Sequence, residues 1–416
     1  MNWKNWAFLI GALVSHGACG SSDSEKPSIA IGLSVALSGE NAYPVVQDVV
    51  ERAVSEINAA GGIGGRSLRL IVKDNETSLE STKSSIQAFL GEGIVGLIGP
   101  DYSDAVREAL PLIKGNKLVT VSGSSTAADL ATADDGGFLF RNIPHDDFQG
   151  IAMAHYLTKV ASPTVNEAAL VYQNDSYGKG LAGSFKKEFE ARGGKVTSSV
   201  VFEPGLTEQS LHAMWGQVVA AKPTTIVLVT FIGEAVKIIQ HWDDSQELNQ
   251  AQWFFTDAVK IDTLAKARPA ALEGMRGTSP THAKGAPFDE FAQKLKDVVG
   301  DDIETSGISN YYDGVYLLAL ALALQVEKGQ ALGQDGLREA IMQVATPGQG
   351  NQKFRASQWK AALESLAAVD YDGASGPCDF DSNGEALAPY EVWKIVNGAF
   401  QSEVYLEPSQ LIPGGK

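Results

Sequence analysis

The feature that most constrains the fold is the alternation of short apolar runs with segments of helical periodicity. Residues 168–172 and 196–202 predict strands, and residues 179–191 between them predict a helix. The same order continues through residues 211–256. Repeated strand–helix units of this length predict parallel sheets with helices on both faces. At 416 residues, the chain is long enough for two domains, each with its own core.

The stretch of residues 94–126 contains two of these units. Residues 94–98 predict a strand buried on both faces, and residues 118–121 predict the next strand. Ser103 and Asp104 are expected to cap the helix between them. Because the strands are parallel, their carboxyl ends lie at one edge of the sheet, where open α/β sheets bind ligands.

Three hydroxyl residues, Ser103, Ser125 and Thr126, are expected at this edge. Free backbone N–H groups and the helix dipole favour an anion there, so one hypothesis is that they hold a ligand carboxylate. The alternative is that all three are helix caps and turn residues, which Ser and Thr commonly are. From this stretch alone, the alternative is favoured.

The overall charge narrows the classes of partner. A formal net charge of −17 and a pI near 4.8 argue against nucleic acid and anionic membrane surfaces. They do not argue against a zwitterion, which has no net charge to repel. Two cysteines, Cys19 and Cys378, are too few for a disulfide framework or a Cys-rich metal site.

Residues 1–18 have the pattern of an export signal: a basic start, a short apolar run and small residues before Cys19. This resembles a bacterial lipoprotein signal, in which Cys19 becomes the lipidated first residue and residues 19–27 form a flexible linker. His16 departs from that motif, and the alternative is an unlipidated secretory signal. On either interpretation the protein is exported, to the periplasm or cell surface. If Cys19 is lipidated, the lipid anchor is expected to be the only contact with the membrane.

Five motifs carry a resemblance to a known family. They are Ile-Gly-Leu-Ser at 31–34, Glu-Ile-Asn-Ala-Ala-Gly-Gly-Ile-Gly-Gly-Arg at 56–66, Ile-Gly-Pro at 98–100, Asn-Asp-Ser-Tyr-Gly-Lys-Gly-Leu at 174–181 and Tyr-Asp-Gly-Val at 312–315. In this order and spacing they resemble the type I periplasmic binding proteins. The chain is most similar to the leucine/isoleucine/valine-binding branch of ABC-importer receptors.

The resemblance implies an α/β fold of two doubly wound parallel-sheet lobes joined by three crossovers. Residues 28–144 and 281–376 are expected to form lobe 1, and residues 145–280 and 377–405 to form lobe 2. Residues 406–416 are expected to form a C-terminal tail. The crossovers fall at the junctions of these ranges, and such a hinge lets the lobes close on a ligand without unfolding.

The resemblance also assigns roles to individual residues. Ser103 and Thr126 match the residues that bind the ligand carboxylate, with Ser125 beside them. Tyr177 matches an aromatic residue from the second lobe, and Asp257 matches an acid for the ligand ammonium. The alternative for Asp257 is a helix cap.

Three aromatic residues complete the expected site. Tyr43 and Phe231 are candidates for the pocket around the ligand side chain, and the alternative is that both are ordinary core residues. Thr77 and Tyr102 stand where the leucine-type receptors place a disulfide. Tyr102 is therefore expected to reach into the pocket and reshape it.

The sequence lacks the common motifs for catalysis and for cofactor or metal binding. The sequence has no Gly-x-Ser-x-Gly elbow, Walker loop, His-Glu-x-x-His or Cys-x-x-Cys. Residues 379–390 begin like a calcium loop but lack its final acid, which predicts a turn. The apolar run within residues 306–328 is too short to span a bilayer and predicts a buried helix.

The leading hypothesis is an exported, non-enzymatic receptor without a cofactor or metal. It would bind an amino acid, branched-chain-like, or a similar small polar solute and deliver it to ABC permease subunits. Two alternatives stay open: a sensor subunit that uses the same clamp, and an enzyme working in the interlobe cleft.

Overall fold

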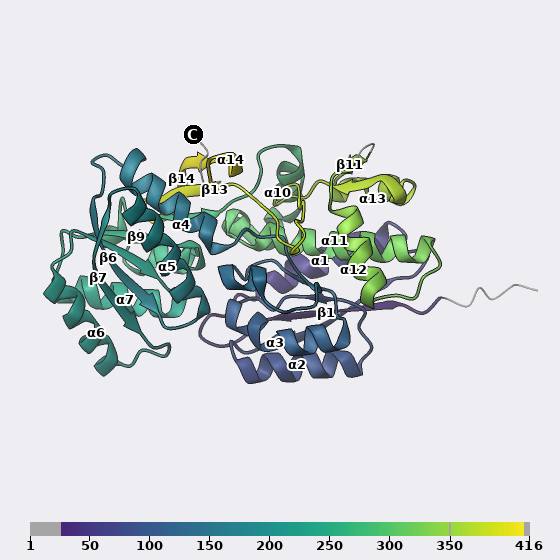
Figure 1. The fold of residues 1–416 in the computed structure, drawn as a ribbon, viewed down its shortest axis with the longest axis horizontal. Helices are drawn as coiled ribbons and strands as arrows, with labels where there is room; N and C mark the ends of the chain where they lie inside the picture. The colour runs from purple at the N-terminus through teal and green to yellow at the C-terminus, as the bar shows by residue number, and fades with distance from the viewer. Residues whose placement is uncertain (1–25, 349–350, 412–416) are drawn as a thin grey trace, which may run out of the picture.

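The computed structural model describes residues 26–348 and 351–411, which form two α/β lobes side by side (Figure 1). The predictions for residues 1–18 and Cys19 lie outside the described residues. The first sheet is parallel, with the order β2-β1-β3-β4-β5. Its strands are β1 (Ile29–Val35), β2 (Leu68–Asp74), β3 (Leu97–Ile98), β4 (Thr120–Ser122) and β5 (Leu139–Arg141).

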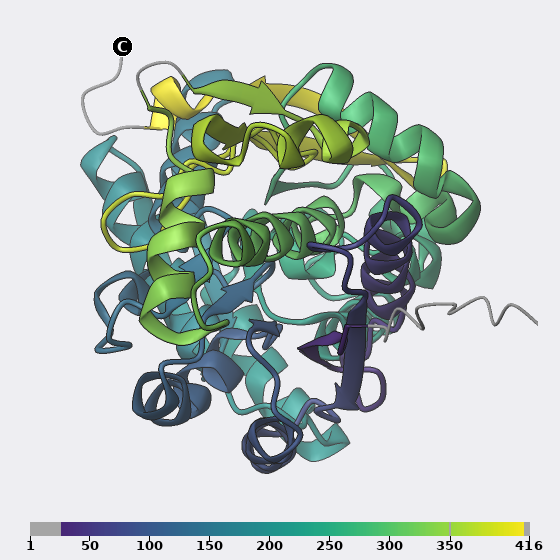
Figure 2. The same ribbon diagram turned by 90° about the vertical axis from the view of Figure 1, so that its right-hand side faces the viewer.

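Helices cover both faces of this first sheet. On one face, α2 and α3 pack together, and on the other α11 packs against α1 and α12 (Figures 1 and 2). The helices of this lobe are α1 (Val45–Ala59), α2 (Leu79–Gly91), α3 (Ser103–Asn116), α10 (Ala286–Val299), α11 (Ile308–Glu327), α12 (Gln334–Val344) and α13 (Trp359–Leu363). A small parallel pair, β11 (Gln352–Phe354) and β12 (Val369–Tyr371), lies beside them.

The second sheet has seven strands in the order β14-β13-β10-β9-β8-β6-β7. They are β6 (Glu167–Gln173), β7 (Lys195–Phe202), β8 (Thr225–Val229), β9 (Gln252–Phe255), β10 (Arg276–Pro280), β13 (Tyr390–Val396) and β14 (Ala399–Leu406). Strands β6 to β10 are parallel, and β13–β14 is an antiparallel hairpin at one edge.

Two apolar clusters form the core of the second lobe, one on each face of its sheet. One cluster joins the sheet to α4 and α5, and the other joins it to α6, α7 and α8. The helices of this lobe are α4 (Asp146–His155), α5 (Ser176–Ala191), α6 (Glu208–Ala221), α7 (Ile232–Ser245), α8 (Asp262–Ala267), α9 (Pro269–Leu272) and α14 (Pro408–Leu411). Within the expected tail, Leu411 of α14 is buried in a cluster with α4, and residues 412–416 lie outside the described residues.

The chain crosses between the lobes three times, and the third crossing lies later than predicted. The first follows β5 and the second lies between β10 and α10. The third was expected at residues 377–379, but Phe380 still packs against Phe140 of β5, with ring centroids 5.1 Å apart. Arg141 then bonds to Glu385, so lobe 1 holds the chain through that residue. The crossing lies between Glu385 and β13, because a buried ion pair and an aromatic contact extend lobe 1.

The start of α3 corrects another prediction. Ser103 is the first residue of the helix, preceded by Tyr102, and the cap position makes no side-chain hydrogen bond. The Ser103 hydroxyl instead accepts a hydrogen bond from the Ala127 backbone N–H at 3.1 Å. Ser103 and Asp104 therefore do not cap α3, because the Ser103 hydroxyl connects the helix to the segment after β4.

The predicted buried helix is confirmed as α11. Every residue from Ile308 to Gln325 is buried, so the helix is enclosed by the first lobe instead of facing solvent on one side. Each fully buried leucine of this helix contributes roughly 1.5–3 kcal/mol of transfer free energy. In the part of the chain that the structure describes, no helix combines the length and apolar character needed to cross a bilayer.

Candidate functional site

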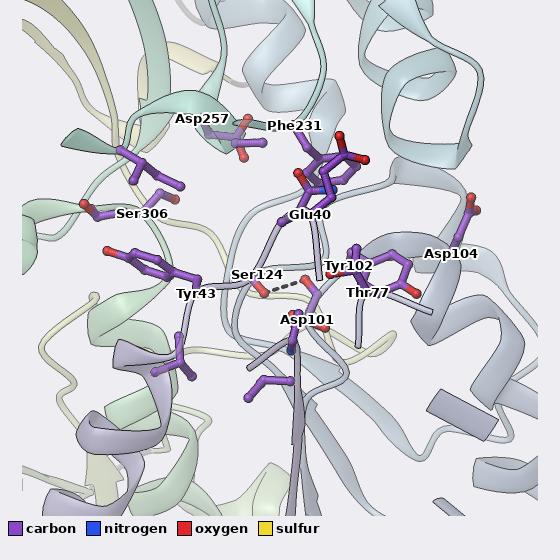
Figure 3. A pocket seen from close by; sticks show the side chains of 18 of the residues that line it. Glu40, Tyr43, Thr77, Asp101, Tyr102, Asp104, Ser124, Phe231, Asp257 and Ser306 are labelled. Atoms are coloured by element: carbon purple, nitrogen blue, oxygen red, sulfur yellow. Dashed lines mark hydrogen bonds between the residues drawn. The ribbon is translucent and has the colours of Figure 1, made fainter. Parts of the chain in front are cut away.

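A cavity of about 510 Å³ lies between the two lobes, and both contribute to its walls (Figure 3). The first lobe supplies segments that follow β1, β2, β3 and β4, together with the start of α11. The second lobe supplies segments that follow β6, β7, β8 and β9. The cavity thus lies at the carboxyl ends of the parallel strands, the edge where open α/β sheets bind ligands.

The first-lobe wall is fixed by hydrogen bonds around Asp101. One carboxylate oxygen of Asp101 accepts a bond from the Ala36 backbone N–H at 2.8 Å, and the other accepts one from Asn75 Nδ2 at 2.7 Å. The Asp101 carbonyl accepts a bond from the Ser124 hydroxyl at 2.6 Å, and Ser124 is also 2.6 Å from the Tyr311 hydroxyl. These contacts join the ends of β1, β3, β4 and α11 into one surface. Burial raises the pKa of Asp101 above its ordinary value.

The second-lobe wall is built around Asp257, which follows β9. The Tyr177 hydroxyl donates a hydrogen bond to Asp257 Oδ1 at 2.8 Å and lies 2.9 Å from Thr256 Oγ1. The Tyr177 ring also contacts Phe231, with centroids 5.2 Å apart. Tyr177 is buried and supports both of these residues from behind, while Asp257 and Phe231 line the cavity. Burial raises the pKa of Asp257, and the hydrogen bond from Tyr177 opposes that rise.

Asp175 adds a second carboxylate to this wall. It caps α5, because its Oδ1 accepts a hydrogen bond from the Gly178 backbone N–H at 2.6 Å. Its Oδ2 accepts one from Gln173 Nε2 at 2.5 Å. Burial raises the pKa of Asp175 to about 6.

Four of the eight residues expected in the site line the cavity: Tyr43, Tyr102, Phe231 and Asp257. The structure does not bring the other four, Ser103, Ser125, Thr126 and Tyr177, to its surface.

The three hydroxyl residues lie behind the wall. Ser103, Ser125 and Thr126 are 3%, 0% and 1% exposed, respectively. The Ser103 hydroxyl accepts the Ala127 N–H, and the Ser125 hydroxyl lies 2.7 Å from that of Ser122. The Ser103 and Ser125 hydroxyls thus bond within lobe 1 and connect neighbouring turns, although Ser103 does not cap α3.

An acid that the sequence prediction did not include lies beside Thr126. Asp146 begins α4 and is fully buried, and its backbone N–H donates to the Thr126 carbonyl at 2.8 Å. Burial, with Asp257 nearby, raises the pKa of Asp146 well above its ordinary value. The Thr126 hydroxyl and the Arg141 guanidinium oppose that rise. Asp257 therefore lies in the second-lobe wall, and the buried Asp146 lies close behind it.

Other lining residues also escaped prediction from the sequence. Asp101 directly follows Gly99-Pro100 at the end of a predicted strand, and Asp175 follows another, so the sheet-edge rule applied to acids would have found both. Tyr311 lies in the first turn of α11, just before the apolar run, where no pattern separates a lining ring from a core ring.

The described residues offer no metal centre. Within residues 26–348 and 351–411, no group of three or more His, Cys, Asp or Glu side chains could hold a metal ion. The calcium-like segment is a turn, as predicted: Asp381 Oδ1 accepts the backbone N–H groups of Asn383 at 2.8 Å and Glu385 at 3.0 Å.

The receptor family ligand-binding region matches residues 45–398, most of the chain. The chain belongs to this family. The Leu/Ile/Val-binding protein of Escherichia coli is 27% identical over 305 residues, which covers 70% of this chain and 77% of that protein.

Solved structures share the fold at lower identity. The substrate-binding protein LivJ from Streptococcus pneumoniae, in complex with isoleucine, has a TM-score of 0.73 at 20% identity over 91% of this chain and 99% of that chain. A solute-binding protein from R. palustris, in complex with benzoate, has a TM-score of 0.70 at 17% identity over 92% of this chain and 97% of that chain. The predicted type I periplasmic binding protein fold is confirmed.

Proposed function

We propose that this protein is the extracytoplasmic substrate-binding component of an ABC importer. It holds a small polar solute with an ammonium group, an amino acid or a relative, between its lobes and delivers it to the permease subunits. The observation that carries the proposal is the interlobe cavity with the Asp257 carboxylate in its wall. The similarity of the chain to Leu/Ile/Val-binding proteins supports the proposal.

The proposed role of Asp257 follows from its surroundings. An ammonium group paired with a partly buried carboxylate forms charge-assisted hydrogen bonds of about 1.5–3 kcal/mol each. The Tyr177 hydrogen bond fixes the orientation of the Asp257 carboxylate before a ligand arrives. The carboxylate therefore loses less conformational freedom on binding. Phe231 and Tyr43 supply apolar surface for the rest of the ligand.

The experiment is calorimetric titration or thermal shift of the purified protein across amino acids, short amides, amines and related metabolites. At least one compound is expected to bind saturably, and Asp257→Asn is expected to weaken it roughly 10- to 150-fold, the equivalent of about 1.5–3 kcal/mol. The matched control is Glu208→Gln, the same charge change on an exposed residue of α6. A flat response across the whole panel, or equal affinities for Asp257→Asn and Glu208→Gln, would contradict the proposal.

A further inference from the structure

The cavity wall has a strong excess of negative charge. Its lining contains six acids and no Lys, Arg or His: Glu40, Glu76, Asp101, Asp104, Asp175 and Asp257. At the rim, Glu40 pairs with Lys237, and Asp104 lies 3.9 Å from Arg107. Deeper in the cavity, Asp101, Asp175 and Asp257 have no ion-pair partner among the residues that the structure describes.

The groups that could offset a ligand carboxylate are engaged elsewhere. Ser103, Ser125 and Thr126 are buried, and their polar groups bond within the protein. The N-terminus of α3 would favour an anion, but Asp101 and Asp104 flank it and offset the helix dipole. A carboxylate in this cavity would therefore face several like charges without a basic partner.

Aromatic rings supply the remaining part of a cation site. Tyr43, Tyr102, Phe231 and Tyr311 line the same cavity as the three deep acids. Figure 3 shows the first three of these rings together with Asp101 and Asp257. The face of an aromatic ring attracts a cation, and the attraction increases when the cation is desolvated. Rings combined with carboxylates suit an amine or quaternary ammonium head with an aliphatic body.

We infer that the ligand of this cleft is a small organic cation without a neutralising carboxylate, whose charged group lies between Asp257 of lobe 2 and Asp101 of lobe 1. This inference rests on the proposed function and specifies its substrate class. The net charge of −17 acts in the same direction, because the field of the whole protein raises the local concentration of cations.

Matched pairs of compounds test the charge of the ligand. Calorimetry compares 3-methylbutylamine with leucine, which adds a carboxylate to the same skeleton, and choline with glycine betaine. The cation is expected to bind at least tenfold more tightly in one pair or both, and the two pairs separate primary amines from quaternary ammonium compounds. The inference is overturned if, in either pair with measurable binding, the zwitterion binds as tightly as the cation or more tightly. It is also overturned if none of the four compounds binds. The titration across amino acids, short amides, amines and related metabolites tests the proposed function independently of these two pairs.

A pair of variants tests the role of the cavity charge. Thr77 lines the cavity, and its hydroxyl makes only a long bond of 3.3 Å to the Ser38 carbonyl. Thr77→Lys adds a positive charge, while Thr77→Gln adds a neutral side chain of similar length at the same backbone conformation. The lysine variant is expected to bind the preferred cation at least tenfold more weakly than the glutamine variant at an equal melting temperature. Equal affinities in the two variants would overturn the inference.

Discussion

Replacing Glu385 with alanine is expected to destabilise lobe 1 strongly, because it removes one half of a buried ion pair. Arg141 is 0% exposed and Glu385 is 8% exposed. Arg141 Nε donates to Glu385 Oε1 at 2.8 Å, and Nη2 lies 2.7 Å from Oε2. Arg141 Nη1 also donates to the carbonyls of Ser125 at 3.1 Å and Ala127 at 2.8 Å. One guanidinium thus connects the third crossover to the segment after β4.

The magnitude follows from what the substitution leaves behind. Glu385→Ala leaves the Arg141 charge buried and unpaired, which costs about 3–5 kcal/mol. Urea unfolding followed by far-UV circular dichroism measures this as a loss in the free energy of unfolding.

Two controls separate charge burial from loss of a side chain. Glu167→Ala removes an acid from the exposed pair with Lys195, whose atoms are 3.5 Å apart, and should cost no more than about 1 kcal/mol. The double substitution Arg141→Met with Glu385→Met should recover much of the loss, because neither charge then remains buried alone. A cost for Glu385→Ala no larger than that for Glu167→Ala would refute the reasoning.

Two further predictions concern pH and membrane attachment. Burial raises the pKa of Asp175 to about 6 and that of Asp257 above its ordinary value, so both lose negative charge as the pH falls. Affinity for the preferred cation should therefore decrease between pH 7.5 and pH 5 at constant ionic strength, and calorimetry that gives a constant affinity would contradict this. The proposed lipidation of Cys19 predicts that labelling with radioactive palmitate in a bacterial host is lost in Cys19→Ser, and retained labelling would exclude Cys19 as the attachment site.

The order of the elements was predictable from the sequence because it depends on local patterns. Apolar runs such as residues 168–172 and the helical spacing that follows them are properties of a few neighbouring residues. The uninterrupted apolar run of α11 likewise predicts burial from every side. These patterns, with the family motifs, were enough for two α/β lobes and for a ligand site at the carboxyl ends of the strands.

Which strand-end side chains reach that site was decided only by the tertiary structure. Asp101 and Ser103 are two residues apart at the same sheet edge, yet Asp101 lines the cavity while Ser103 bonds to the backbone of Ala127. The third crossover likewise depends on Arg141 and Glu385, which are 244 residues apart in sequence. Contacts of this kind depend on how distant segments pack, and a local sequence pattern contains no information on that packing. The sequence by itself therefore determined that the chain forms two lobes and that a ligand site lies at the carboxyl ends of their strands. Long-range packing determined that the cleft between the lobes is lined with acids and aromatic rings.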